Sequence, residues 1–170
     1  MVNINYLKNP FNYIGGKYKL LPQILPLFPK KIDKFVDLFG GGGEVSLNVN
    51  AKQVVYNDKC EPLVNIFRNL DSKFVDEVKE MIDTYKLNKF SKQEFLNLRS
   101  YYNTNLKDKL DRENAVVLYC LITHAFNYQI AFNKSREFNM PSGASRSYFS
   151  KSLDCLLYTS DAADDRISVD

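Results

Sequence analysis

Apolar residues in the first seventy positions occur in short runs that glycine, proline or polar residues interrupt. The runs at 34–39 and 53–58 are short, largely apolar and bounded by such breakers, which predicts two strands buried in a parallel sheet. Helices are predicted near 17–25, at 44–50 and in the segment that opens with Glu61, with prolines limiting the first. Strand, glycine turn, helix and strand in this order indicate the start of a doubly wound α/β fold.

The pattern changes at about Asp71. Apolar residues then recur at helical spacing up to residue 126, which predicts a mostly helical insert without a strong strand. His124 lies in the last of these apolar stretches, and we interpret it as a packed or capping residue. Residues 126–149 mix Asn, Ser, Lys and Arg with aromatics, and this composition indicates an ordered loop or hairpin.

The end of the chain does not continue either pattern. Composition changes abruptly at Cys155, and the run 155–164 resembles a translated transposon-adapter sequence; an ordinary acidic, frayed terminus is the alternative. We therefore expect a strand-containing part at 1–70, a helical insert at 71–150, and a non-native or disordered tail at 151–170.

Composition limits the class of protein. With 170 residues, 45% hydrophobic and 25% charged, the chain is expected to form a soluble domain with its own core. No apolar run approaches the ~20 residues that span a bilayer, and the N-terminus has no apolar signal core. Three cysteines without short spacing and one histidine argue against a zinc site or a disulfide framework, and favour the cytoplasm. The net charge of +3 suits a polyanion partner but is common among unrelated proteins.

The turn Gly40–Gly43 after the first predicted strand is the first candidate site. Glycines let the backbone adopt positive φ and pass close to a ligand, and free N–H groups of the following helix lie beside it. A phosphate-binding P-loop needs Lys and Ser or Thr after its last glycine, whereas Glu44 follows here, which excludes that motif. The pattern Gly41-x-Gly43-x-x-Ser46 approaches a dinucleotide fingerprint. Glu44 would repel a pyrophosphate, and the sulfonium of S-adenosylmethionine avoids that conflict.

Asp58 is the second candidate. It ends the second predicted strand, where a carboxylate can accept hydrogen bonds from both hydroxyls of a ribose. Alone, Asp58 would more often be a helix cap. Together with the glycine turn, the contact to a ribose is the better interpretation.

Four blocks carry a resemblance to a known family: Asn12–Leu21, Phe35–Asn48, Val55–Asp58 and Phe126–Gly143. Their order and spacing are similar to those of the Dam-type N6-adenine DNA methyltransferases. The resemblance implies a Rossmann-like S-adenosylmethionine-dependent methyltransferase fold, here with an incomplete sheet, and a helical target-recognition insert. It also implies methyl transfer to adenine in double-stranded DNA without a metal, by a cytoplasmic, site-specific enzyme of a bacterial or phage-infected cell, with a monomer favoured.

The resemblance implies individual contacts as well. Lys17 in the first block has a chemical reason for this role, since its ammonium can neutralise the methionine carboxylate. Phe39 either packs under the adenine or fills the strand end. The residues expected to bind the cofactor are Tyr13, Lys17, Phe39, Gly41, Gly43 and Asp58.

The last block combines basic, aromatic and amide side chains, which suit contact with phosphates and bases. For Phe138 and Phe149 we expect the core instead. The residues expected to bind DNA are Phe126, Asn127, Gln129, Asn133, Lys134 and Arg136.

The chain departs from the family's pattern in two places, which affect how it reads DNA bases and whether it can catalyse the reaction. Ala131 stands where the family usually has a base-reading arginine, and Arg136 replaces the usual glycine before Glu137, so that a guanidinium from Arg136 is a candidate substitute. The family's catalytic Asp-Pro-Pro-Tyr is absent, since no two of the six prolines are adjacent. We therefore expect no catalytic residue in this chain and interpret it as an inactive fragment. The first alternative is a non-catalytic DNA- or cofactor-binding module, and the second is an NAD-type Rossmann enzyme.

Overall fold

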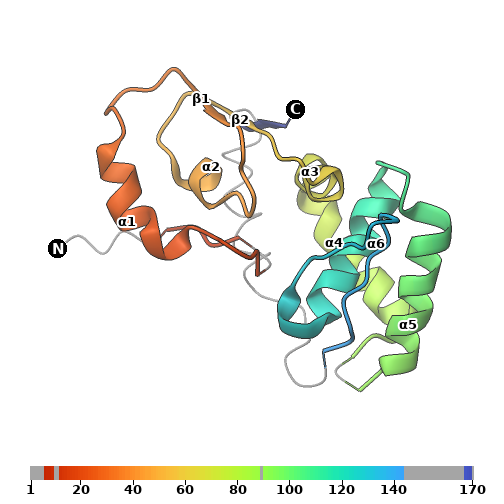
Figure 1. Cartoon of the computed structure of the whole chain (residues 1–170). Coiled ribbons are helices and arrows are strands. Elements are labelled where there is room, and N and C mark those ends of the chain that lie inside the picture. The colour runs from red at the N-terminus through yellow and green to blue at the C-terminus, as the bar shows by residue number, and fades with distance from the viewer. Residues whose placement is uncertain (1–5, 10–11, 89, 144–166, 170) are drawn as a thin grey trace.

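The computed structural model describes residues 6–9, 12–88, 90–143 and 167–169. A small sheet with short helices forms one part of the molecule, and a group of longer helices forms the other (Figure 1). The chain is therefore a mixed α/β protein whose strands and long helices occupy different regions.

Three short parallel strands form the sheet, in the order β1-β2-β3. They are β1 (Lys34–Asp37), β2 (Gln53–Tyr56) and β3 (Ile167–Val169). Because β1 pairs with β2 in the register Asp37 to Tyr56, the residues that follow the two strands emerge at the same edge. Both strands lie where the sequence predicts them, and each ends two residues earlier than its predicted run.

The third strand departs from the sequence-based expectation. Residues 167–169 belong to the segment expected to be a disordered or non-native tail, yet they pair with β2 in parallel. Two of the three are β-branched and apolar, which suits a strand, and their backbone occupies the hydrogen-bonding edge of β2 that β1 leaves open. Residues 144–166 and 170 lie outside the described residues.

The first predicted helix is broken into three pieces. The chain forms the 3-10 turn η1 (Tyr18–Leu20), the helix α1 (Leu21–Ile24) and the 3-10 turn η2 (Leu25–Leu27) in place of one helix over 17–25. Each of the last two pieces has a proline in its first turn. Since proline lacks an N–H group, it starts a helical segment easily but cannot continue the preceding one.

The helix α2 (Glu44–Asn48) follows the glycine turn and is shorter than the predicted 44–50. It ends because Val49 is extended, with ψ of 138°. Val49 is buried and packs with Ala51 and Val54 in a small hydrophobic cluster. The helix contacts both β1 and β2, so it fixes the glycine turn against the strands.

The second part of the molecule is helical, as predicted for residues 71–126. Asp71 caps α4 (Ser72–Thr84) and Asp111 caps α6 (Arg112–His124). They accept hydrogen bonds from the amides of Phe74 (3.0 Å) and Asn114 (2.9 Å), as expected of N-cap aspartates. No helix among the described residues is long and apolar enough to cross a membrane. The elements are α3 (Glu61–Arg68), α4 (Ser72–Thr84), α5 (Lys92–Tyr101), the π-helical turn η3 (Tyr102–Leu106), α6 (Arg112–His124) and the 3-10 turn η4 (Phe126–Tyr128).

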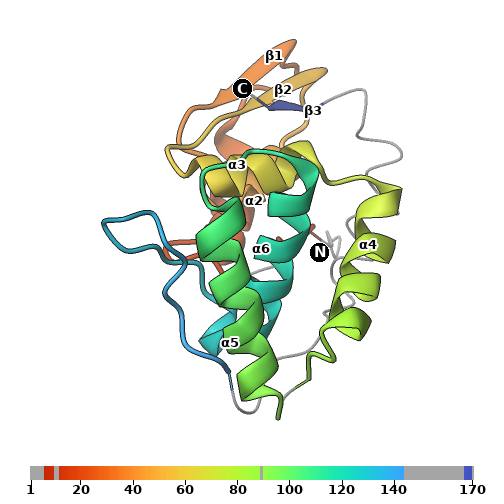
Figure 2. The same ribbon diagram turned by 90° about the vertical axis from the view of Figure 1, so that its right-hand side faces the viewer.

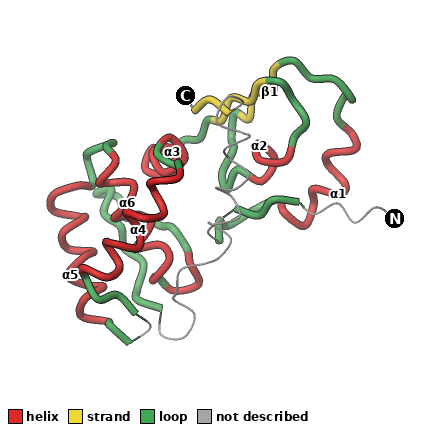
Figure 3. Tube along the Cα trace, turned by 180° about the vertical axis from the view of Figure 1, so that it is seen from behind, coloured by secondary structure: helices red, strands yellow, loops and turns green. Residues whose placement is uncertain are grey.

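The helix α6 is the centre of this part. Figure 2 shows α6 surrounded by α3, α4 and α5, with α3 between the other helices and the sheet. Every residue from Asn114 to His124 is buried, which explains why the sequence of α6 is apolar on all sides rather than amphipathic. The tube view from behind shows that α3 carries the chain from the strands to the helices (Figure 3).

His124 ends α6 and is buried, as the sequence predicts. Its Nδ1 lies 2.9 Å from the carbonyl oxygen of Cys120; because a carbonyl can only accept, Nδ1 carries the proton. Burial lowers the pKa of His124, and the hydrogen bond to Cys120 opposes this in part. The histidine is therefore neutral in the folded protein near neutral pH.

The depressed pKa of His124 predicts a loss of stability in mild acid. The unfolded chain takes up a proton at an ordinary histidine pKa near 6.5 and the folded chain only at lower pH. The free energy of unfolding should therefore fall as the pH drops below about 6.5, by at most about 1.4 kcal/mol per pH unit. Urea unfolding followed by circular dichroism between about pH 7 and about pH 5.5 measures the slope. Since the sequence has one histidine, His124→Gln should flatten it, and an equal slope in that variant would refute the assignment.

The segment after α6 forms the predicted loop-like hairpin. Two isolated antiparallel bridges join its sides, Ala125 to Ser142 and Phe132 to Phe138. Phe138 is buried and packs edge-on against Phe132 at 6.0 Å between ring centroids, which confirms that it faces the core. Phe149 lies outside the described residues.

Candidate cofactor and nucleic-acid site

The candidate site begins where β1 and β2 end. The glycine turn follows β1, and Asn57 and Asp58 follow β2. The amide of Gly40 donates to the carbonyl of Asn57 (2.9 Å), and the amide of Gly41 donates to Oδ2 of Asp58 (2.8 Å). The two elements that the sequence singled out therefore touch directly, at the sheet edge where nucleotides bind in open α/β folds.

Two of the four glycines adopt backbone conformations that other residues avoid. Gly41 has φ of +52° and Gly43 has φ of +77°, in the left-handed region that favours glycine. The amide of Gly43 donates to the carbonyl of Gly40 (2.8 Å) and closes a tight turn. The prediction of positive φ at this turn is confirmed.

Tyr56, the last residue of β2, supports the turn from below. Its ring is 1% exposed, and its hydroxyl donates to the carbonyl of Gly41 at 2.7 Å. Burial, with the negative charge of Asp58 adding to it, raises the pKa of Tyr56, so the hydroxyl keeps its proton. Tyr56 is not among the residues predicted from the sequence, although an aromatic residue with a hydroxyl at the end of a strand is the available signal.

Asp58 is half-buried and contacts two backbone segments. Besides the amide of Gly41, it accepts a hydrogen bond from the amide of Cys60 through Oδ1, at 2.9 Å. Cys60 is the N-cap residue of α3, so the carboxylate also orders the start of that helix. Each carboxylate oxygen can accept more than one hydrogen bond, and the partial exposure of Asp58 leaves room for a ligand hydroxyl.

Tyr13 lies against the glycine turn, as a cofactor-binding aromatic requires. A methyl group added to Gly41 would come within 2.8 Å of the Tyr13 ring. The pKa of Tyr13 is raised by burial and by the charges of Asp58 and Cys60. The structure thus brings Tyr13, Gly41 and Asp58 together, although they come from three separate blocks of the sequence.

Lys17 and Phe39 are exposed beside this cluster. The ammonium of Lys17 donates to the carbonyl of Gly15, which leaves the charge at the surface of the loop. Phe39 is 82% exposed, which excludes one of its two expected roles, that of filling the strand end. Its exposed face is available to a ligand.

The loop that carries Tyr13 also reaches the predicted DNA-binding segment. The backbone amide of Asn12 donates to the carbonyl of Tyr128 (3.2 Å), and its side-chain amide donates to the carbonyl of Asn127 (3.1 Å). Both acceptors are in the left-handed region, with φ of 55° at Asn127 and 56° at Tyr128. Adjacent residues thus contact the glycine turn and the start of the hairpin, a connection that the sequence analysis missed.

The predicted DNA-binding residues differ in their solvent exposure and in the hydrogen bonds that they already make. Phe126 is 52% exposed, and Lys134 is exposed, whereas Asn127 and Gln129 are half-buried. Asn133 is exposed, but its Oδ1 accepts hydrogen bonds from the amides two and four residues later, at 2.9 and 3.0 Å. Asn133 therefore shapes the tip of the hairpin.

Arg136 has an ion pair that the sequence does not predict. Its Nη2 lies 2.8 Å from Oε2 of Glu61, the first residue of α3, and both side chains are more than half exposed. The backbone of Arg136 has φ of 61°, which gives a physical reason why a glycine is usual at this position in the family. The ion pair joins the hairpin tip to the helix that starts beside Asp58.

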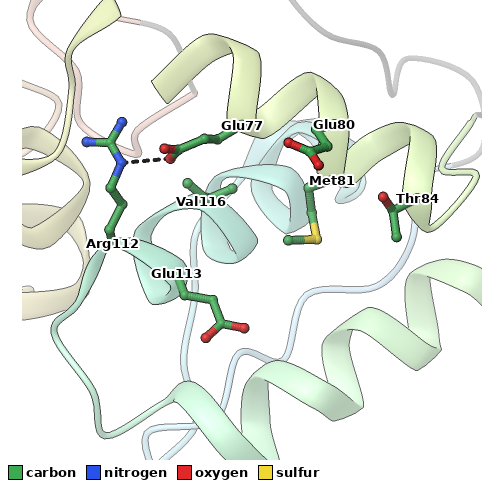
Figure 4. Close-up of a pocket in the computed structure, with 7 residues that line it drawn as sticks. All are labelled: Glu77, Glu80, Met81, Thr84, Arg112, Glu113 and Val116. Atoms are coloured by element: carbon green, nitrogen blue, oxygen red, sulfur yellow. Dashed lines mark hydrogen bonds and ion pairs between the residues drawn. The ribbon is translucent and has the colours of Figure 1, made fainter. Parts of the chain in front are cut away.

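A separate hollow of about 380 Å³ lies between α4 and α6. Figure 4 shows three glutamates on its walls and the ion pair between Arg112 and Glu77, whose atoms are 2.7 Å apart. Arg112 also pairs with Asp71 at 2.7 Å and lowers the pKa of that carboxyl group. None of the predicted site residues lines this hollow, and its acidic walls do not suit DNA.

The side chains of the described residues form no group of three or more histidine, cysteine or acidic residues that could hold a metal ion. The predicted cofactor-binding residues in this region are the glycine turn, the Asp58 carboxylate, the rings of Tyr13 and Phe39, and Lys17. Such a set can hold a nucleoside with a charged amino-acid group through hydrogen bonds and stacking.

Comparison with known proteins identifies a family and relatives of this chain. The model of the D12 class N6 adenine-specific DNA methyltransferases matches residues 13–169. The chain is 46% identical over 152 residues to Modification methylase StsI of Streptococcus sanguinis, covering 87% of this chain and 22% of the relative. It is 44% identical over 153 residues to Type II methyltransferase M.FokI of Planomicrobium okeanokoites, covering 88% and 23%. A DNA adenine methylase of Haemophilus influenzae is 26% identical over 145 residues, with 82% and 49% covered. The chain thus spans less than a quarter of the two more similar of these relatives.

Proposed function

Because the chain belongs to the D12 class N6 adenine-specific DNA methyltransferase family, we propose that it is part of an enzyme that methylates adenine N6 in double-stranded DNA. S-adenosylmethionine is the proposed methyl donor, and the sheet is the start of a Rossmann-like methyltransferase sheet. The observation that carries the proposal is the hydrogen bond from the amide of Gly41 to Asp58. It joins the glycine turn to the acid at the sheet edge where such folds bind a nucleoside.

In the proposed complex Asp58 accepts hydrogen bonds from the ribose hydroxyls, and Lys17 pairs with the methionine carboxylate. Tyr13 and Phe39 contact the adenine or the sulfonium. Gly41 lets the backbone approach the nucleoside, because a side chain there would meet the Tyr13 ring. The ribose hydroxyls and the methionine carboxylate of the donor thus each have a candidate partner among these residues.

DNA is proposed to bind along the hairpin. Phe126 and Gln129 are the candidates for contacts with bases, and Lys134 for a phosphate. Arg136 would release Glu61 and turn to the DNA, which is inexpensive, because an exposed ion pair contributes only about 0–1 kcal/mol. We propose that the protein acts as a monomer in the cytoplasm, in a DNA-modification system.

The transfer step itself is assigned to groups outside this sequence. The family's Asp-Pro-Pro-Tyr does not occur in the 170 residues, and these residues would polarise and stack the flipped adenine. The chain is therefore proposed to hold the cofactor and the DNA without catalysing the reaction.

The test is methyl transfer by a protein of the full length of the relatives. Incubated with S-adenosylmethionine carrying a labelled methyl group and with duplex DNA, the long protein should produce N6-methyladenine, detected by mass spectrometry of the digested DNA. The 170-residue chain should yield none. Label on cytosine, or no label with the long protein, would contradict the proposed reaction.

A further inference from the structure

Glu44 is a buried carboxylate between the two loops of the candidate site. It is the first residue of α2 and is 5% exposed. Its carboxylate lies against the backbones of Gly16 and Gly42; a methyl group added there would come within 2.6 and 2.9 Å of its oxygens. Glycine at both positions leaves the space that the carboxylate occupies.

The charge of Glu44 has no cationic partner in the described part of the chain. Among the described residues its carboxylate accepts a hydrogen bond from the side-chain amide of Asn9, which is neutral, and the ion pairs there do not include it. Removing an ionised carboxylate from water costs several kcal/mol unless a charge or several hydrogen bonds compensate it. Such a buried charge beside a ligand site indicates that the ligand supplies the cation.

Lys17 follows Gly16 in the same short loop. Its ammonium bonds the carbonyl of Gly15, while the carboxylate of Glu44 contacts the adjacent Gly16. One cation and one anion beside two consecutive glycines complement an α-amino acid, which carries both charges on neighbouring atoms. In S-adenosylmethionine that group is the methionine end.

We propose that Glu44 binds the α-ammonium group of the methyl donor and, with Lys17, selects ligands that carry an intact amino-acid end. The inference rests on the proposed cofactor and adds a residue to its site. In the sequence, Glu44 indicates only that a pyrophosphate would be repelled; the proposed contact gives it a role in binding the cofactor's ammonium group.

The test compares two ligands that differ only in the amine. S-adenosylhomocysteine carries the ammonium, whereas 5′-deoxy-5′-(3-carboxypropylthio)adenosine keeps the carboxylate and lacks the amine. Calorimetric titration of the 170-residue chain should show tighter binding of S-adenosylhomocysteine. Glu44→Gln should weaken that binding by about 10- to 100-fold, as expected for a hydrogen bond between charged groups, and leave the affinity for the deaminated ligand unchanged.

Glu44→Gln is chosen because the glutamine oxygen can still accept the hydrogen bond from Asn9. It should also raise the melting temperature of the ligand-free chain, since it removes an uncompensated buried charge. Glu80→Gln, the same change at an exposed position of α4, is the control and should alter neither ligand's affinity.

The outcomes separate this inference from the proposed cofactor. Equal weakening of both ligands, or no change for either, would assign Glu44 to packing alone and overturn the inference. Equal affinity of the unmodified chain for both ligands would also overturn it while leaving the proposed cofactor intact. Failure of the unmodified chain to bind either ligand would count against the proposed function itself.

Discussion

Replacing Gly40 with alanine should lower the free energy of unfolding by about 3 kcal/mol, at the upper end of the usual range for overpacking. The added methyl group would lie 2.2 Å from a ring carbon of Tyr56. That ring cannot move aside easily, because its hydroxyl is bonded to Gly41 and its face packs against Phe67, with 4.6 Å between centroids. Urea unfolding followed by far-ultraviolet circular dichroism measures the change, since the chain has no tryptophan.

A double-mutant cycle isolates the clash between a methyl group at position 40 and the Tyr56 ring. Tyr56→Leu removes the ring, so Gly40→Ala should cost much less in that background than in the unmodified chain. Gly15→Ala is a comparison at a glycine with φ of +86°, where an added methyl group would meet only the Lys17 ammonium at an ordinary contact distance of 4.0 Å and only backbone strain of about 1 kcal/mol is expected. An equal cost of Gly40→Ala with and without the Tyr56 ring would show that the ring is not the cause.

The second large effect is expected at Asp58. Asp58→Asn should weaken binding of S-adenosylhomocysteine by roughly 100-fold, because a carboxylate that accepts two ribose hydroxyls contributes about 3 kcal/mol. Calorimetric titration of the variant provides the measurement. Asp76→Asn, at an exposed position of α4, controls for the loss of one negative charge.

The structure changes what Asp58→Ala is expected to do. From the sequence alone the variant should weaken cofactor binding and leave the fold intact. Because the carboxylate also accepts hydrogen bonds from the amides of Gly41 and Cys60, its removal should lower stability as well, by about 1–3 kcal/mol. Asn keeps one acceptor oxygen and is therefore the cleaner substitution; unchanged affinity in the Asn variant would remove Asp58 from the ribose-binding role.

The sequence predicts the parts of the fold that depend on local pattern. The strands β1 and β2, the glycine turn and the apolar helix α6 follow from short-range spacing of apolar residues and glycine, and the structure has them. The predicted helix at 17–25 fails because two prolines divide it. The strand β3 is missed because its three residues form a strand only through pairing with β2, which lies more than a hundred positions away.

The candidate site shows the same limit. Tyr13, Gly41 and Asp58 are predicted from their sequence blocks, and the structure places them in contact. Glu44 is missed because its carboxylate bonds Asn9, 35 positions earlier, and occupies the space that Gly16 and Gly42 leave by having no side chain. The ion pair between Arg136 and Glu61 spans 75 positions. Neither contact leaves a periodic or spacing signal in the sequence.

The central claim is that this chain is a binding site for S-adenosylmethionine, and titration of the purified 170-residue chain with S-adenosylhomocysteine and, separately, with NAD tests it most directly. We expect one site per chain for S-adenosylhomocysteine and no measurable heat with NAD. Binding of NAD alone would contradict it and would assign the glycine turn to a dinucleotide instead.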